Sequence, residues 1–339
     1  RIVMNNKERF LAALAREEVD RVSVACPLQT ATVEMMAETG TAWPEAHSSA
    51  QKMAKLALAA NRLGGIESVR VPFDLCVEAE ALGSAIHGGN SDSQPSIKDP
   101  VLSDPEKFYS LEVSNPSEAG RMPVVLEAIK LVKEEDPSLP IIAGITGPFT
   151  LAGQIRGVEA LLMDMFDNPS FFKALLSFTT EVLVSYGRAL EKAGADSVVV
   201  IDPSAGSELL GSDFYQEAAY PPCSKLVHSL DKPAILHICG DSTPLLGMMA
   251  DTGVAGVSLD HLVDIQKAKE LVGDRVAIIG NINPPDTLFL GKPEDVRAEA
   301  LECIAKGVNI LAPGCGIPPG TKLENIRAMA EAAKAAAKE

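Results

Sequence analysis

A histidine and a cysteine, two residue types that commonly bind metal ions, stand two positions apart in the stretch AILHICGD (residues 234–241). In an extended strand the side chains of residues i and i+2 project to the same face, so His237 and Cys239 point together. A third candidate ligand is Cys315 in LAPGCGIPPGT, where glycines on both sides allow a sharp turn around the thiol. Imidazole and thiolate are common zinc ligands, and three protein ligands leave a fourth position open. These residues predict an open zinc site; the alternative is a core histidine beside inert cysteines.

Eight short, mostly β-branched segments could position these residues on a sheet. Helical patterns separate the segments from the third onward, which favours a (β/α)8 TIM barrel over the alternative of a doubly wound open sheet. An amphipathic helix over residues 5–16 precedes the first strand. No linker or repeat divides the chain, so we expect a single barrel domain over residues 1–339. The expected strands cover residues 22–26, 68–72, 140–145, 197–201, 234–238, 256–259, 276–280 and 308–312.

The connection between the second and third strands departs from this alternation. About seventy residues separate the two strands, and they include GSAIHGGNSDSQPSIKDPVLSDPEK, which is rich in Gly, Ser, Pro and Asp. This composition predicts an ordered loop or hairpin rather than a helix. Because the long insert follows strand 2, we expect it on the face of the barrel where the strands end.

Polar residues concentrate where the expected strands end, which is where barrels of this class build their active sites. Asp260 ends the sixth strand and could be a fourth zinc ligand that an incoming substrate displaces, although it could also cap the following helix. We expect His261 to hydrogen-bond locally at a helix start. Further polar residues at strand ends are Gln29, Asp74, Thr146, Asp202, Asn281 and Asn283.

Composition narrows the classes of partner. The 339 residues carry 30 basic and 46 acidic side chains, a formal charge of −16, with no cluster of Lys and Arg, so nucleic acid is not an expected partner. No apolar run approaches the roughly 20 residues that span a bilayer, and the opening RIVMNNKERF lacks a signal-peptide stretch, so we expect a cytoplasmic protein without a membrane partner. Cysteines outside the predicted zinc site are expected to be small buried hydrophobic residues: Cys26, Cys76, Cys223 and Cys303.

Several passages resemble those of the uroporphyrinogen decarboxylase superfamily, and within it the methylcobamide:coenzyme M methyltransferases. The passages are QTATVEMMAETGTAWPEAHSSAQKMAKLA, VRVPFDLCVEAEALG, HICGD and APGCGIPPGTKLENIRAM, and the resemblance covers nearly the whole chain. It implies a barrel with Zn²⁺ in its mouth, and the family's ligand signature falls on His237, Cys239 and Cys315. It also implies methyl transfer from a methylated corrinoid, carried by a partner protein, to the thiol of coenzyme M.

The decarboxylases of the superfamily resemble the chain less. Asp74 falls at the position of their catalytic aspartate, but the N-terminal region reads VACPLQTATVEMM and lacks the arginines that hold porphyrinogen carboxylates.

The candidate zinc ligands would also suit a corrinoid-dependent enzyme whose acceptor is a different thiol or a folate. A zinc-dependent sensor or a corrinoid chaperone would be a non-enzymatic use of them.

The resemblance suggests roles for residues around the metal. Coenzyme M would displace water or Asp260 from zinc, which makes Asp260 a candidate catalytic residue. Asp74 is the second candidate, because it falls at the position of the decarboxylases' catalytic aspartate. Backbone N–H groups near GNINPP, with Asn281 and Asn283, are candidates to hold the sulfonate. Arg70 and Arg156 are alternative sulfonate partners. The loops at the barrel mouth, including the long insert, should form the surface on which the corrinoid protein docks.

Overall fold

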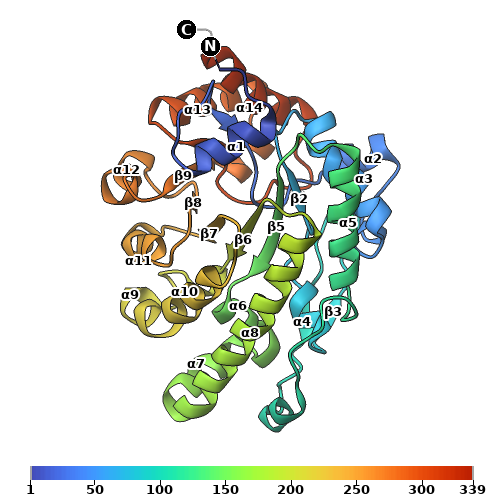
Figure 1. The fold of residues 1–339 in the computed structure, drawn as a ribbon, viewed down its shortest axis with the longest axis vertical. Coiled ribbons are helices and arrows are strands. Elements are labelled where there is room, and N and C mark those ends of the chain that lie inside the picture. The colour runs from blue at the N-terminus through green and yellow to red at the C-terminus, as the bar shows by residue number, and fades with distance from the viewer. Residues whose placement is uncertain (1, 338–339) are drawn as a thin grey trace.

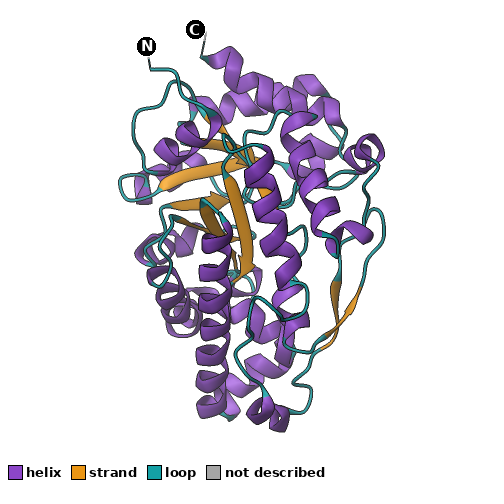
Figure 2. Cartoon of the chain, turned by 45° about the vertical axis from the view of Figure 1, so that its right-hand side comes forward, coloured by secondary structure: helices purple, strands orange, loops and turns teal. Residues whose placement is uncertain are grey.

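The computed structural model describes residues 2–337, in which helices enclose a curled parallel sheet (Figures 1 and 2). The sheet of this part of the chain has eight strands in the order β1-β10-β9-β8-β7-β6-β5-β2. Neighbouring strands pair in parallel, so each needs a crossover connection, and the helices lie in these crossovers. The strands are β1 (Ser23–Val24), β2 (Val69–Val71), β5 (Ile141–Thr146), β6 (Ser197–Ile201), β7 (Ala234–Ile238), β8 (Gly256–Leu259), β9 (Ala277–Ile282) and β10 (Ile310–Pro313).

All eight predicted strands are confirmed, and so is the barrel. The strands are rich in Val and Ile because helices cover one face of the sheet and side chains fill the other; every residue of β6 and β7 is buried. The edge strands β1 and β2 meet where the N–H of Glu67 donates a hydrogen bond to the carbonyl of Val24 at 2.8 Å. The Ser68 hydroxyl accepts a second bond from the Cys26 N–H at 3.0 Å. These contacts bring the two edges of the curled sheet together.

The helices begin and end where the sequence provides caps. The Asn168 side chain accepts from the Phe171 N–H, Pro169 occupies the first turn of α8, and Gly194 ends it. The predicted N-terminal helix is α1. The helices are α1 (Asn6–Leu14), α2 (Val33–Thr39), α3 (Ala50–Arg62), α4 (Val77–Ala81), α5 (Met122–Glu135), α6 (Pro148–Arg156), α7 (Val158–Asp167), α8 (Pro169–Ala193), α9 (Gly211–Phe214), α10 (Tyr220–His228), α11 (Leu246–Asp251), α12 (Ile265–Val272), α13 (Pro293–Ala305) and α14 (Leu323–Ala336), with short turns η1 (Glu45–His47) and η4 (Tyr215–Ala219).

The insert after β2 contains the predicted hairpin, which Figure 2 shows standing beside the barrel. Its strands β3 (Ala85–His87) and β4 (Ser96–Asp99) pair antiparallel. Gln94 donates from its side-chain amide to the Phe73 carbonyl at 3.0 Å, and the Cys76 thiol donates to the Pro95 carbonyl at 3.4 Å. The hairpin is therefore tied to the segment that directly follows β2.

One continuous apolar core joins the strands to the helices. The four cysteines expected to be hydrophobic residues, Cys26, Cys76, Cys223 and Cys303, are all buried as free thiols. Within residues 2–337, no helix has both the length and the apolar character needed to cross a membrane.

Candidate metal centre

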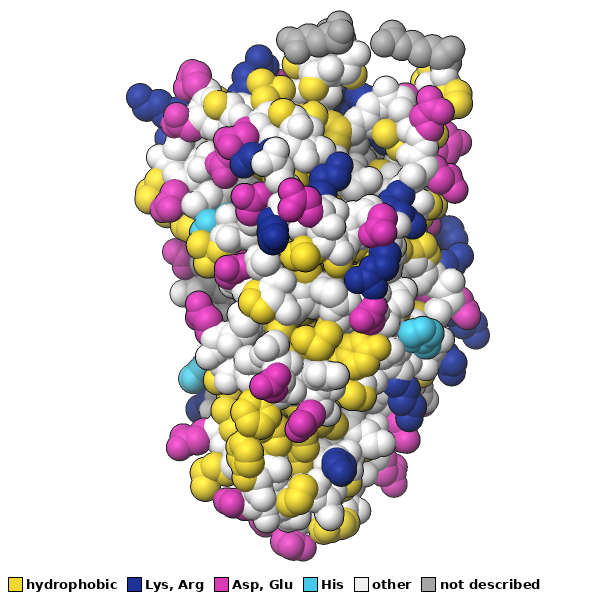
Figure 3. Space-filling model, turned by 90° about the vertical axis from the view of Figure 1, so that its left-hand side faces the viewer, with side chains coloured by type: hydrophobic (Ala, Val, Ile, Leu, Met, Phe, Trp, Pro, Cys, Tyr) yellow, Lys and Arg dark blue, Asp and Glu magenta, His cyan; other side chains and the backbone are white. Residues whose placement is uncertain are grey.

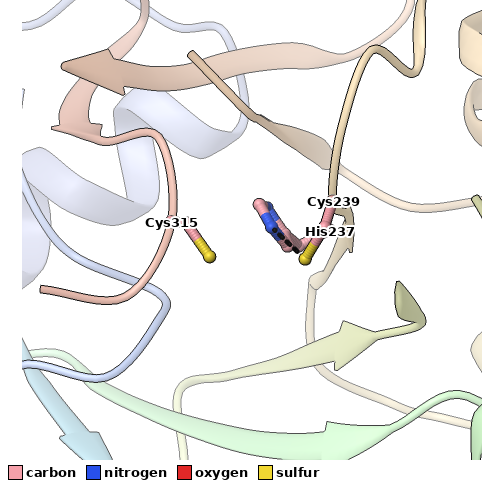
Figure 4. Close-up of side chains that lie close together, drawn as sticks. All are labelled: His237, Cys239 and Cys315. Carbon is pink, nitrogen blue, oxygen red and sulfur yellow. Dashed lines mark hydrogen bonds between the residues drawn. The ribbon is translucent and has the colours of Figure 1, made fainter. Parts of the chain in front are cut away.

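Three potential metal ligands converge inside the barrel (Figure 4). One ligand atom from each of His237, Cys239 and Cys315 lies within 4.8 Å of the other two. The Cys239 sulfur is 3.5 Å from Nε2 of His237. The tertiary structure thus brings together the three residues that the sequence predicts as ligands, although β7 and β10 are not neighbours in the sheet.

The local backbone explains how distant segments meet. His237 lies on β7 and is fully buried, and Cys239 directly follows that strand at intermediate exposure. Cys315 lies in the loop after β10. A Cβ atom at Gly314 would come within 2.6 Å of the backbone nitrogen of His261, so only glycine permits the loop to pass this close.

Hydrogen bonds fix the orientation of the His237 ring. Its Nδ1 lies 3.1 Å from the carbonyl oxygen of Ser258 and 2.9 Å from the hydroxyl of the same residue. A carbonyl can only accept, so Nδ1 carries the proton and Nε2 keeps a free lone pair on the side of the two cysteines. Metal-bound histidines are commonly held in this way.

The two thiols interact strongly. The pKa of Cys315 is lowered, chiefly because the Cys239 thiol hydrogen-bonds to its sulfur. The pKa of Cys239 is raised because it provides that hydrogen bond and because it is buried. The Cys315 sulfur is thus ionised more readily than the Cys239 sulfur. One imidazole and two thiols fit the ligands that zinc prefers.

Asp260 lies next to the centre, but its carboxylate is outside the group of converging ligand atoms. One oxygen accepts from the N–H of Gly240 at 2.9 Å, and the other accepts from the N–H of Leu262 at 3.0 Å. Nδ1 of His261 is 3.1 Å from the second oxygen. In this arrangement the carboxylate holds the turn that follows Cys239, and its role as a fourth ligand stays a prediction.

The two predicted asparagines are engaged within the protein. Asn281 donates from its amide nitrogen to the carbonyls of Asp260 at 3.0 Å and Val263 at 2.8 Å. The Asn283 side chain accepts from the N–H of Asp286 at 2.9 Å at the start of a helical turn. Both amides therefore shape the loops after β8 and β9 rather than facing open space.

Arg70 is a buried cation without an ion-pair partner. It lies on β2 with 2% of its surface exposed, and its guanidinium donates to the backbone carbonyls of Pro27, at 3.1 Å, and Pro72. Within residues 2–337, Nη2 makes no hydrogen bond and no carboxylate lies within 4.0 Å. Burial lowers its pKa to about 10. Gln29, two residues after Pro27, accepts through its carbonyl from the N–H of Ile317 at 2.8 Å, so Arg70 and the loop of Cys315 contact the same segment.

The second candidate arginine has a different setting. Arg156 ends α6 and forms an ion pair with Asp164, with 2.7 Å between Nε and the carboxylate. It also donates to the carbonyl of Leu102 at 2.9 Å and stacks over the ring of Phe171. Its charge is therefore compensated within the protein.

Asp74 is paired with an arginine that sequence reasoning missed. Both carboxylate oxygens accept from the guanidinium of Arg121, at 3.0 and 2.7 Å, and Nδ1 of His47 is 3.7 Å away. This pairing keeps the pKa of Asp74 below its usual value although burial opposes it. Asp74 and Arg121 are 47 positions apart, and no local motif marks Arg121. Sequence reasoning also missed Ser258, which contacts Nδ1 of His237, because no local motif marks it either. Asp74 thus anchors the start of α5, and its catalytic role stays a prediction.

Fold and site together define a (β/α)8 barrel in which one histidine and two cysteines converge as candidate metal ligands. The family model for uroporphyrinogen decarboxylase (URO-D) matches residues 5–336. The methylcobamide:CoM methyltransferase MtbA of Methanosarcina acetivorans is 42% identical over 332 residues, which cover 97% of each chain. The methylcobamide:CoM methyltransferase MtaA of Methanosarcina barkeri is 39% identical over 96% of each. A solved methyltransferase from Methanosarcina mazei superposes with a TM-score of 0.95 at 38% identity, covering 98% of this chain and 99% of that one. The chain therefore belongs to the uroporphyrinogen decarboxylase family.

Proposed function

We propose that the chain transfers a methyl group from a methylated corrinoid, carried on a separate protein, to the thiol of coenzyme M (2-mercaptoethanesulfonate). The convergence of His237, Cys239 and Cys315 carries this proposal, because a His-Cys-Cys centre suits the activation of a thiol. The methylcobamide:CoM methyltransferases, which align with almost the entire chain, support the same choice of donor and acceptor. A cytoplasmic location stays an expectation from the sequence.

The reaction requires the acceptor as a thiolate. A sulfur–carbon bond forms while the cobalt–carbon bond breaks, both electrons of the broken bond stay on the corrinoid as Co(I), and the thiol proton leaves to solvent. Free thiols have a pKa near 8.5 and are mostly protonated at neutral pH. Zinc held by His237, Cys239 and Cys315 would supply Lewis acidity that lowers the pKa of an incoming thiol.

The surrounding residues orient this centre. Ser258 holds the His237 ring with Nε2 toward the two cysteines, and Asp260 holds the turn after Cys239 through the Gly240 N–H. If the carboxylate of Asp260 also contacts the metal before substrate binds, it must give up that contact when the thiol arrives. The turn would still be held, because the contact with Gly240 uses one carboxylate oxygen only.

Arg70 is the best candidate to bind the sulfonate of coenzyme M. A buried guanidinium that lacks a counterion is costly, and an anionic group would compensate its charge. Its Nη2 donors have no acceptor among residues 2–337, whereas Asn281, Asn283 and Arg156 make hydrogen bonds within the protein. Contact between opposite charges about 4 Å apart is worth about 4 kcal/mol at an effective dielectric constant of about 20.

The proposed reaction is tested with free methylcobalamin under anaerobic conditions. We expect its absorbance to change only when zinc-loaded protein and coenzyme M are both present. Cys315→Ala should abolish both bound zinc and turnover, whereas the matched control Cys303→Ala, at a buried cysteine outside the centre, should keep both. If methylcobalamin stays intact while each chain binds one zinc ion, the proposed acceptor is wrong.

The role of Arg70 is tested by pairing a protein change with a substrate change. Coenzyme M is compared with 2-mercaptoethanol, which has a hydroxyl in place of the sulfonate. The unsubstituted enzyme should prefer coenzyme M by up to ~10³-fold in kcat/KM, and Arg70→Met should lose most of this preference. An Arg70→Met enzyme that binds zinc and keeps the full preference would refute the assignment.

A further inference from the structure

An apolar surface lies at the end of α7 and in the segment between β6 and α10. Phe166 on α7 is 65% exposed and Met163 on the same helix is 57% exposed. The ring of Phe166 contacts that of Phe214 edge to face, with 5.6 Å between centroids, so the two segments form one surface. Figure 3 shows hydrophobic side chains gathered on the lower part of this face of the molecule. We call this surface the apolar rim; it consists of Val158, Met163, Phe166, Leu209 and Phe214.

One of the two segments of the apolar rim is attached to the strand and loop that carry His237 and Cys239. Its two segments follow β5 and β6, so they leave the sheet at the carboxyl ends of the strands, where barrels of this class bind their substrates. Ser207 donates from its hydroxyl to the carbonyl of Asp241 at 2.9 Å, two residues beyond Cys239. The N–H of Asp202, at the end of β6, donates to the carbonyl of His237 at 3.0 Å. The segment that carries Leu209 and Phe214 is therefore attached to β7, which carries His237, and to the loop after it, which carries Cys239.

The charges on the two segments of the apolar rim are acidic, whereas Lys173 and Lys225 lie nearby in a pocket that they share with Met165 and Glu217. Residues 158–170 and 203–217 contain no lysine or arginine. The exposed acidic residues there are Glu159, Asp167, Glu208, Asp213 and Glu217. An apolar centre surrounded by charge is the usual organisation of a protein–protein interface. A partner that fits this surface presents apolar side chains surrounded by Lys and Arg.

We propose that the apolar rim is the docking surface for the protein that carries the methylated corrinoid. This inference rests on the proposed function, since only a protein-bound donor needs such a surface. A corrinoid that must deliver its methyl group inside the barrel has to be presented beside the loop of Cys239, and the rim borders that loop. Apolar contact at Phe166 and Phe214 holds the carrier, and the acidic border attracts its basic side chains.

The test compares one variant with two methyl donors. Phe166→Asp places a charge at the centre of the rim and leaves the metal ligands untouched. With a purified methylated corrinoid protein that the unsubstituted enzyme turns over, kcat/KM should fall at least ~10-fold, as for an interface hot spot. With free methylcobalamin, kcat/KM should stay within about twofold, because free cofactor does not use the rim. Leu271→Asp, an equally apolar-to-acidic change at an exposed position on α12, is the matched control and should affect neither donor.

Each outcome has a distinct meaning. Equal losses with both donors, no loss with either, or the same loss in Leu271→Asp would overturn the docking proposal. So would an enzyme that consumes free methylcobalamin but turns over no corrinoid protein. An unsubstituted enzyme that fails with free methylcobalamin and coenzyme M refutes the proposed function instead. Sedimentation of the unsubstituted protein completes the test: a dimer that Phe166→Asp dissociates would show that a second copy covers the rim.

The dependence of the rate on salt concentration independently tests whether the partner that docks on the apolar rim is basic. If basic side chains of the carrier meet the acidic border, raising the ionic strength should lower kcat/KM for the protein-bound donor. The free donor should show a much weaker dependence. A rate with protein-bound donor that rises with salt would contradict the predicted charge of the partner.

Discussion

The aromatic cluster beneath the insert contains a histidine whose burial should make the protein sensitive to acid. His47 is 3% exposed, stacks on Trp43 with 5.0 Å between ring centroids, and contacts the edge of Phe73. Neither ring nitrogen has a hydrogen-bond partner among the described residues. The charged groups that face it are Asp74 and Arg121, which act in opposite directions. Burial dominates and lowers the pKa of His47 from 6.5 to about 4.

The sign of the effect follows from proton binding. Between pH 6.5 and about 4 the unfolded chain binds a proton at His47 that the folded protein does not bind, so the free energy of unfolding decreases as the pH falls. This shift in pKa corresponds to about 3 kcal/mol in full, of which about 2 kcal/mol is lost between pH 7 and pH 5. Asp202 acts in the opposite direction. Burial raises the pKa of its carboxyl group to about 6, so the free-energy cost of burying the charged carboxylate disappears as the group is protonated at lower pH. The contribution of His47 is therefore obtained only from a comparison of variants.

The variant His47→Phe keeps an aromatic ring against Trp43 and removes the titration. The free energy of unfolding is measured with urea at pH 7 and at pH 5 for both proteins. We expect the unsubstituted protein to lose about 2 kcal/mol more than His47→Phe when the pH is lowered from 7 to 5. Phe73→Leu alters the same cluster without removing a titratable group, so its cost should be the same at both pH values. Parallel pH profiles for His47→Phe and the unsubstituted protein would refute the reasoning, whatever the absolute stability of the variant.

Three further changes address the site itself. Gly144→Ala would place a methyl group against the guanidinium of Arg70, so we expect a loss of about 1–3 kcal/mol in urea unfolding and a higher KM for coenzyme M; an unchanged KM would argue against a role of Arg70 in binding. Ser258→Ala leaves His237 only the backbone carbonyl as a partner, and zinc affinity measured by chelator competition should fall about tenfold. Cys315→Ala should lower the zinc content of purified protein well below one ion per chain, and retention of zinc would exclude it as a ligand.

Local sequence patterns were sufficient to predict the barrel strands, an ordered loop or hairpin in the insert, and the N-terminal helix. Each of these depends on residues that are close in the chain. Buried parallel strands need runs of β-branched residues, and a helix start needs a side chain that accepts from nearby N–H groups. The alternation of strands and helices then favoured a barrel, and the curled sheet with β1 meeting β2 confirms that choice over an open sheet.

The candidate ligands could be named from the sequence for a related reason. His237 and Cys239 share a face because they lie two apart on one strand, and the glycines beside Cys315 mark an unusual turn. The sequence could not show which polar residues near the strand ends are free to bind a substrate and which make hydrogen bonds within the protein. Asn281 and Asn283 had the right types for binding an anion, but a tertiary contact engages the amide of Asn281 and a local helix cap engages that of Asn283, whereas Arg70 forms no ion pair among residues 2–337.

The sequence by itself determined the order of strands and helices, the three candidate ligands and the acidic character of the chain, since all of these depend on residue type and short spacing. Only the tertiary structure decided that Arg121 pairs with Asp74, that Ser258 fixes the His237 ring, and that Phe166 meets Phe214. Such contacts join segments tens of residues apart. Their formation depends on how the closed sheet brings strand ends together, which no local pattern specifies.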